Sequence, residues 1–203
     1  KNGKLIYFSS SEIYNGLEKN FTENKSGNIN FDNARATYIN GKKFGETLSY
    51  NKIKEGYSVL ILRLSLAYGP GAGLTDKRVL NDFILKALEA GKIKMLDQGV
   101  NIRKYIFISD VIIYLFKLIS KNKIGAFNIS GKSRTTILNL AKTISKKTNA
   151  NLILPIKNQS IPGAPKSVNI SIKKINKVYK LKLLDFNEGL NKTIKWYKFL
   201  LKK

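Results

Sequence analysis

The sequence contains no cysteine and no histidine, so several kinds of chemistry lack their usual side chains. Without cysteine there is no disulfide framework and no thiolate nucleophile, which fits a reducing compartment, and we predict a cytoplasmic protein. Without either residue we expect no metal site, and proton transfer would have to come from Tyr, Lys, Asp or Glu. The apolar runs are too short to span a bilayer, and no signal peptide opens the sequence.

Acidic residues are scarce, because 13 Asp and Glu stand against 37 Lys and Arg, for a formal net charge of +24. Such a charge is typical of proteins that bind nucleic acid or anionic membranes. Here 32 of the 37 cations are lysines scattered along the chain, and 21 Asn and 25 Ile accompany them, which indicates a coding bias spread over solvated surface. We therefore predict no specific nucleic-acid partner and no membrane partner, although the field would attract a phosphorylated ligand.

The order of apolar segments predicts an α/β fold. Two continuous apolar runs, Leu5 to Ser9 and Val59 to Leu66, have the pattern of buried parallel strands. A helix that carries Tyr38 and Lys42 lies between them, which predicts a strand, helix, strand unit with a right-handed crossover. We find no internal repeat and no low-complexity linker.

The rest of the sequence continues this alternation of strands and helices. We expect Asp110 and either Thr135 or Thr136 to cap helices, and Gly91 to close one. The expected elements are a turn over Tyr68 to Gly73, a helix over Val79 to Ala90, strands over Ile93 to Leu96 and Tyr105 to Ile108, a helix over Val111 to Ile119, a strand over Phe127 to Ile129, a helix ending at Thr148, a strand over Leu152 to Leu154, and helices over Ser171 to Tyr179 and Asn187 to Leu201.

Tyr38 and Lys42 are four residues apart, so on a helix they share one face. A lysine ammonium beside a tyrosine phenol favours the ionised phenol, which makes the pair a candidate general acid and base. The alternative is that Tyr38 packs against the fold and Lys42 is one solvated lysine among 32. Taken alone, the pair decides nothing.

Polar residues follow both of the first two strands. Ser9 to Glu12 come at the end of the first strand, and Ala67 to Gly69 come at the end of the second. Ligands of open parallel sheets bind beyond the carboxyl ends of the strands, so both segments are expected beside the helix of Tyr38. The alternatives are a capped turn for the serines and an exposed loop acid for Glu12.

In this order, the segments resemble the extended short-chain dehydrogenase/reductase enzymes, the NAD-dependent epimerases and dehydratases that act on nucleotide sugars. The resemblance covers nearly the whole chain. The similar segments are Ser9 to Tyr14 for the family's Ser/Thr segment, Tyr38 and Lys42 for its Tyr and Lys, Leu62 to Pro70 for R-x-x-N-x-Y-G-P, Arg103 to Asp110 for R-x-Y/F-x-Y-V-x-D, and Phe127 to Gly131 for N-I-G-x-G.

The resemblance implies catalytic roles. Tyr38 would be the general base that takes the sugar 4-hydroxyl proton while a hydride leaves C4 for NAD. Lys42 would hold the nicotinamide ribose and favour the phenolate, and Ser10 would position the sugar hydroxyl. Glu12 would manage a second proton transfer, near C5 of the sugar.

The resemblance also implies binding roles and a partner. Arg103 would neutralise the nucleotide diphosphate with help from Arg78, Ser11 would contact the substrate, and Tyr68 would contact the cofactor. Members of the family are commonly homodimers joined through the Tyr helix and the helix before it, so a homodimer is expected of the complete protein.

The Ser10-Ser11-Glu12 triplet bears on the reaction. The family's 4,6-dehydratases usually have Thr-Asp-Glu there, its 4-epimerases generally lack the Glu, and its UDP-glucuronate decarboxylases have Thr-Ser-Glu. The segment Asp76 to Phe83 is also similar to the decarboxylase sequence D-G-R-V-V-S-N-F. The resemblance therefore implies a decarboxylase-like enzyme, with a 4-epimerase or 4,6-dehydratase as alternatives. A basic module that binds nucleotide sugars or anionic polymers without turnover is the alternative of another class.

Two features depart from the family. Leu66 stands where the family usually has Asn, and no glycine-rich turn between a strand and a helix is present to bind a dinucleotide. The segment Gly69 to Gly73 follows the wrong strand for that purpose. We therefore expect the C-terminal portion of a Rossmann-type doubly wound parallel sheet, with the N-terminal part missing and no activity of the chain alone. Residues 1–70 would be the Rossmann remnant, and residues 71–203 mainly a smaller α/β substrate-binding lobe.

Overall fold

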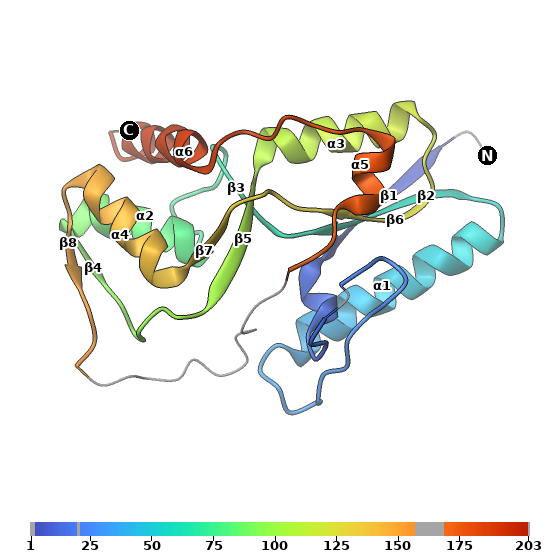
Figure 1. Cartoon of the computed structure of the whole chain (residues 1–203), viewed down its shortest axis with the longest axis horizontal. Coiled ribbons are helices and arrows are strands. Elements are labelled where there is room, and N and C mark those ends of the chain that lie inside the picture. The colour runs from blue at the N-terminus through green and yellow to red at the C-terminus, as the bar shows by residue number, and fades with distance from the viewer. Residues whose placement is uncertain (1–2, 20, 157–168, 203) are drawn as a thin grey trace.

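The computed structural model describes residues 3–19, 21–156 and 169–202 (Figure 1). Helices and strands alternate along nearly the whole chain, as the sequence predicts. The elements are β1 (Lys4–Ser10), the 3₁₀ helix η1 (Ser11–Tyr14), α1 (Ala36–Lys54), β2 (Ser58–Leu64), β3 (Leu66–Tyr68), α2 (Val79–Ala90), β4 (Lys92–Lys94), β5 (Ile102–Phe107), α3 (Ile108–Ser120), β6 (Gly125–Ile129), β7 (Arg134–Thr136), α4 (Ile137–Thr148), β8 (Asn151–Ile153), α5 (Lys173–Val178) and α6 (Phe186–Leu200).

A parallel sheet of order β1-β2-β6 forms the first part of the molecule. The central strand β2 is buried along most of its length and has the unbroken apolar sequence of a strand covered on both faces. On one face, Val59 and Ile61 pack against Ile53 of α1. On the other face, Leu60 and Leu62 pack against α3 and α5. The predicted strand, helix, strand unit is confirmed as β1, α1 and β2.

The prediction of one strand over Val59 to Leu66 is wrong, because that run is divided between two sheets. β2 ends at Leu64, and β3 pairs with β5 in a second sheet of order β3-β5-β7. The backbone N–H of Ser65, between the two strands, donates to the carbonyl of Ile129 at 2.9 Å. Both pieces are apolar, so their composition carries no sign of the break.

The prediction that Asp110 caps the third helix is also wrong. α3 begins at Ile108, three residues before the predicted start at Val111, and Phe107 is its N-cap residue. The Asp110 carboxylate accepts instead from the backbone N–H of Leu184 at 3.0 Å. Burial raises the pKa of this carboxyl, and the Leu184 hydrogen bond acts in the opposite direction. Two other predicted ends are confirmed, since Thr136 caps α4 and Gly91 closes α2 in the left-handed conformation.

A second hydrophobic core lies among α2, α4, α6 and the sheet of β3, β5 and β7, on the left in Figure 1. Strand β5 contributes to two cores. Ile106 packs in the core of Leu60 and Leu62 under α3 and α5, whereas Tyr105 and Phe107 pack in this second core. Gly189 of α6 lies so close to the sheet that a Cβ atom there would come within 2.3 Å of the hydroxyl of Tyr68 in β3 and 2.8 Å of Cδ2 of Phe107 in β5. The boundary predicted at residue 70 stays a prediction.

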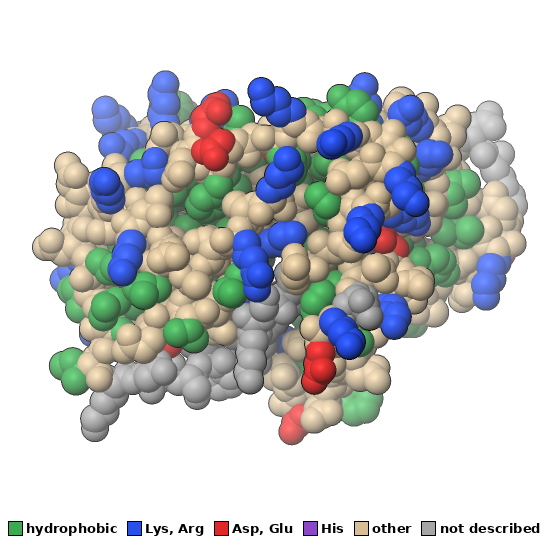
Figure 2. Space-filling model, viewed as in Figure 1, with side chains coloured by type: hydrophobic (Ala, Val, Ile, Leu, Met, Phe, Trp, Pro, Cys, Tyr) green, Lys and Arg blue, Asp and Glu red, His purple; other side chains and the backbone are tan. Residues whose placement is uncertain are grey.

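The surface is dominated by cations. Figure 2 shows Lys and Arg side chains spread over the visible face, with few acidic side chains between them. Across the described ranges, no helix is both long and apolar enough to cross a membrane. In the same ranges, no three Asp or Glu side chains gather as candidate metal ligands.

Candidate active site

Tyr38 and Lys42 lie in the first two turns of α1, beside the carboxyl end of β1. Lys42 Nζ donates to the carbonyl oxygen of Phe8 at 2.8 Å and lies 5.8 Å from the centroid of the Tyr38 ring. The Tyr38 side chain is not a core residue, because 41% of the residue is exposed. The packing alternative therefore does not describe Tyr38, whose ring is open to a ligand.

The serines at the end of β1 form a capped turn, which was the alternative to a role for them in binding or catalysis. Ser10 Oγ accepts from the backbone N–H of Glu12 at 3.1 Å and caps η1. Ser10 is buried and Ser11 is half-buried. This cap fixes the direction in which Glu12 leaves the strand, and it brings Glu12 toward the start of α1.

Glu12 is held by a residue that the sequence analysis did not single out, Arg35. The guanidinium donates from Nη2 to Glu12 Oε1 at 2.7 Å and from Nε to Oε2 at 2.9 Å, a bidentate pair. The hydrogen bonds to Glu12 raise the pKa of Arg35, against the effect of burial. The same guanidinium lies over the Tyr38 ring, 4.7 Å from its centroid. The available signal was the rarity of arginine, since Arg35 is one of five in the chain.

Arg78 is also paired. Its Nε lies 3.0 Å from both carboxylate oxygens of Asp76, and Nη1 donates to the carbonyl of Ala67 at 3.3 Å. The Arg78 hydrogen bonds lower the pKa of Asp76 to about 2. The hydrogen bonds to Asp76 raise the pKa of Arg78, against the effect of burial. The structure thus places Arg78 at the start of α2, with its guanidinium held by Asp76 and by the Ala67 carbonyl of β3.

Arg103 projects from β5, and its Nη1 donates to the carbonyl of Ile102 at 3.0 Å. Burial lowers the pKa of Arg103, while the charges of Glu12 and Asp97 act to raise it. Direct contacts join Glu12, Arg35, Tyr38 and Lys42 into one group, which we call the Tyr38 cluster.

Tyr68 does not belong to the Tyr38 cluster. It is 5% exposed, and its ring packs against those of Tyr105, Phe107 and Phe186. Its hydroxyl donates to the Phe186 carbonyl at 3.2 Å, and burial followed by the charges of two carboxylates raises its pKa. The side chain is committed to the core, so a cofactor contact by this residue could come only from its backbone and stays a prediction.

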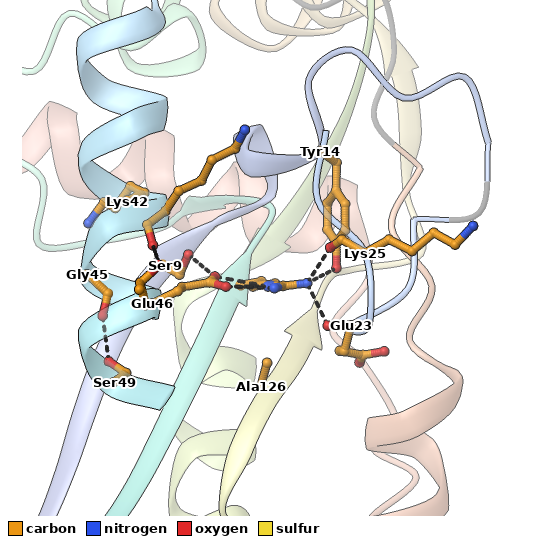
Figure 3. A network of polar contacts seen from close by, with 12 residues as sticks. Ser9, Tyr14, Glu23, Lys25, Lys42, Gly45, Glu46, Ser49 and Ala126 are labelled. Carbon is orange, nitrogen blue, oxygen red and sulfur yellow. Dashed lines mark hydrogen bonds and ion pairs between the residues drawn. The ribbon is translucent and has the colours of Figure 1, made fainter. Parts of the chain in front are cut away.

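A buried ion pair anchors the helix of the Tyr38 cluster to the sheet (Figure 3). Arg63 Nη2 of β2 lies 2.6 Å from Glu46 Oε2 of α1, and the two side chains are 5% and 7% exposed. Ser9 Oγ donates to Glu46 Oε1 at 2.5 Å, and Arg63 Nη1 donates to the Tyr14 hydroxyl at 2.8 Å. Burial alone would lower the pKa of Arg63, but the hydrogen bonds and charge of Glu46 raise it.

This pair is not predicted from the sequence, although Glu46 continues the four-residue spacing of Tyr38 and Lys42. Because Glu46 bonds both Ser9 of β1 and Arg63 of β2, it fixes the rotation of α1 on the sheet. That rotation directs Tyr38 and Lys42 to the strand ends. The arrangement as a whole offers a phenol, a carboxylate and several cations, which suit proton transfer on an anionic ligand.

The chain matches the sequence profile of the NAD dependent epimerase/dehydratase family over residues 1–130. The chain is 28% identical over 177 residues to UDP-glucuronic acid decarboxylase 3 of Arabidopsis thaliana, covering 86% of this chain and 52% of that protein. It is 29% identical over 203 residues to UDP-glucuronic acid decarboxylase 1 of Danio rerio, covering 96% and 47%. The chain thus spans about half the length of the curated relatives it matches.

Solved structures of similar proteins share the fold. A UDP-glucuronic acid 4-epimerase of Bacillus cereus in complex with UDP-glucuronic acid and NAD aligns with a TM-score of 0.79 at 25% identity, over 97% of this chain and 62% of that one. An NAD-dependent NDP-hexosamine 5,6-dehydratase of tunicamycin biosynthesis aligns with a TM-score of 0.83 at 17% identity, over 96% and 63%. The predicted Rossmann-type α/β fold is confirmed.

Proposed function

Since the chain belongs to the NAD-dependent epimerase/dehydratase family, we propose that it carries the proton-transfer residues of a nucleotide-sugar enzyme that decarboxylates UDP-glucuronate. One observation carries the proposal: Tyr38 and Glu12, from separate elements, meet at the carboxyl end of the sheet with a cation between them. The similarity to UDP-glucuronic acid decarboxylases supports the choice of reaction.

NAD is the proposed cofactor, and its ribose end fits the Tyr38 cluster. Tyr38 is half-exposed and Lys42 lies beside it, so a hydroxyl and an ammonium can both reach ribose hydroxyls. When bound, NAD accepts the C4 hydride of the sugar and later returns it. The sequence has no glycine-rich turn for the dinucleotide pyrophosphate, so we assign to this chain only the contacts at the ribose end.

Tyr38 is proposed to take the proton from the sugar 4-hydroxyl and to give it back at the end of the cycle. Lys42 Nζ and Arg35 Cζ lie 5.8 and 4.7 Å from the ring centroid, so two cations stand beside the proposed base. Ser10 is proposed to orient the same sugar hydroxyl. Its Oγ already accepts from the Glu12 N–H, so its own hydrogen is available to donate.

Oxidation at C4 places a ketone beta to the C6 carboxylate. The C5–C6 bond can then break with its electron pair held as an enolate, and carbon dioxide leaves. Glu12 is proposed to relay one proton from water to C5, which restores the ketone before C4 is reduced again. One turnover therefore releases one carbon dioxide, consumes one proton and leaves the cofactor in its starting state.

Binding of the diphosphate is proposed for Arg103 and Arg78, with Ser11 as a further substrate contact. A guanidinium presents several donors in one plane, which suits phosphate oxygens. Arg78 shares its charge with Asp76 in an ion pair. Residues 1–70 are proposed as the Rossmann portion and residues 71–203 as mainly the substrate lobe, and a homodimer is proposed for the complete protein.

The proposal is tested by incubating the full-length protein with NAD and carboxyl-labelled UDP-glucuronate and measuring released carbon dioxide and the nucleotide product. Loss of a general base lowers kcat by about 10²–10⁴-fold, so Tyr38→Phe should do so. Tyr50→Phe, on the same helix and 37% exposed, is the matched control and should retain the activity. Unchanged turnover in Tyr38→Phe would overturn the assignment.

The products separate the alternatives. A 4-epimerase, which the similarity to the Bacillus cereus epimerase favours, would invert C4 and release no carbon dioxide. A 4,6-dehydratase would produce a 4-keto-6-deoxy sugar, but Ser11 stands where those enzymes usually have an acid. A non-catalytic module would bind the nucleotide sugar without changing it. We expect no turnover from the 203-residue chain alone.

A further inference from the structure

Arg35 contacts both Glu12 and Tyr38, the two residues proposed to transfer protons. Its guanidinium forms two hydrogen bonds with the Glu12 carboxylate, at 2.7 and 2.9 Å, and its Cζ lies over the Tyr38 ring, 4.7 Å from the centroid. Glu12 belongs to η1 and Tyr38 to α1, two elements separated by a long polar loop. Among the contacts of the Tyr38 cluster, this side chain joins the two proton-transfer residues.

The position of Arg35 is itself fixed by its backbone. Arg35 directly precedes α1, and its N–H donates to Asn33 Oδ1 at 2.9 Å. Its carbonyl accepts from the N–H of Ile39 at 3.0 Å, within the first turn of the helix. Glu12 is fixed in a similar way by the Ser10 cap. Both partners of the ion pair are therefore held at their backbones before a ligand arrives.

Resting on the function proposed above, we propose that Arg35 is a positioning residue that sets Glu12 and Tyr38 relative to each other. The bidentate pair fixes the direction of the carboxylate, and the cation over the Tyr38 ring limits rotation of the phenol. Arg35 also offsets the charge of Glu12, which would otherwise oppose a sugar that carries its own carboxylate. The substrate class that follows is an acidic sugar nucleotide, rather than a neutral one.

The shape of the guanidinium is central, because lysine has the same charge but no planar fork. A lysine at position 35 could approach one oxygen of the Glu12 carboxylate, but its single nitrogen could not bond both oxygens and also lie over the Tyr38 ring. Loss of the fork should leave both proton-transfer groups in place on their backbones but loosely oriented. A small misplacement of a reacting group can cost about 10²-fold in rate.

The kinetic test uses the full-length protein with Arg35→Ala, Arg35→Lys and Glu12→Gln. We expect Arg35→Ala to lower kcat on UDP-glucuronate by about 10-fold or more with KM changed by less than about 3-fold, and Arg35→Lys to recover little of the loss. The double variant with Glu12→Gln should be no slower than the slower single variant, because both changes disable the same unit. A change in KM alone, or full recovery by lysine, would overturn the proposal.

The control is Lys192→Ala, which breaks the exposed Glu188–Lys192 pair of α6 at 3.0 Å. It should leave kcat and KM as they are, and it shows what loss of an ordinary surface ion pair does. A loss of kcat in Arg35→Ala that merely matched that of Lys192→Ala would contradict a positioning role.

A second measurement needs no turnover and separates the two proposals. In the labelled 203-residue chain, Arg35→Ala should shift the NMR signals of both the Tyr38 ring and the Glu12 carboxylate, whereas Lys192→Ala should shift neither. A shift of only one of the two signals would overturn the joint positioning. If Tyr38→Phe retained full turnover, the proposed function would fail, whereas the spectra would still report whether Arg35 sets both side chains.

Discussion

At the scale of single residues, the buried pair of Glu46 and Arg63 differs from the other ion pairs of the chain. Its side chains are 5% and 7% exposed, whereas both members of the Lys52–Glu55 pair on the same helix are at least half exposed. Exposed pairs contribute about 0–1 kcal/mol because water and salt screen them, whereas removing one partner of a buried pair leaves a charge without compensation. The two pairs therefore provide a comparison within one helix.

We predict that Glu46→Gln lowers the free energy of unfolding by about 3–5 kcal/mol, because the Arg63 guanidinium loses its counter-charge in the interior. Glu55→Gln, the matched control, should change it by less than about 1 kcal/mol. Both values can be measured by urea unfolding followed by circular dichroism. Equal effects of the two substitutions would show that Arg63 reaches water or another acid after Glu46 is changed.

The residues also show which contacts sequence reasoning reaches. Tyr38 and Lys42 were found because a helix places positions four apart on one face, which is a local rule. Arg35 pairs with Glu12 across 23 positions, and Arg63 pairs with Glu46 across 17. No local rule joins such positions, because their contact depends on how strands and helices pack. The burial of Tyr68 could not be predicted for the same reason, since it depends on rings from distant segments.

At the scale of elements, the helices were predicted more closely than the strands. The predicted limits of α2 are those of the structure, because Gly91 ends the helix and the apolar spacing is regular. The run from Val59 to Leu66 was taken as one strand because its apolar residues continue without a turn signal. The break at Ser65 arises from pairing, since β2 has β1 and β6 as neighbours whereas β3 has β5.

The packing of α6 on β5 leads to a prediction for an element. A Cβ at Gly189 would lie 2.3 Å from the Tyr68 hydroxyl and 2.8 Å from Phe107 Cδ2. Real Cβ atoms are not found so close, and overpacking a core typically costs about 1–3 kcal/mol. Gly189→Ala should therefore lower the unfolding free energy by that amount, as measured by chemical denaturation.

Gly41→Ala is the matched control for this prediction. Gly41 lies within α1, and a Cβ there would meet nothing within 4 Å. Alanine is favoured over glycine in a helix by about 1 kcal/mol, so this variant should be as stable as the parent or more stable. A stabilising effect of both substitutions would mean that α6 can move away from Tyr68 at no cost.

At the scale of the whole molecule, the excess of positive charge is uneven along the chain. No Asp or Glu occurs between Val111 and Leu184, although this stretch supplies α3, β6, α4 and α5. Its lysines must repel one another across the fold. The fold is held together against this repulsion by its apolar cores, two of which share strand β5.

Screening should therefore stabilise the molecule. The Debye length falls from about 30 Å at 0.01 M salt to about 10 Å at 0.1 M, so repulsion between distant lysines weakens over that range. We predict that Tm rises between these two sodium chloride concentrations and then levels off, as measured by thermal unfolding at constant pH. Sucrose at matched osmolality carries no charge and serves as the control for general solvent effects. A Tm that fell with added chloride would mean that attraction in the ion pairs, rather than repulsion among lysines, dominates the electrostatics of the folded chain.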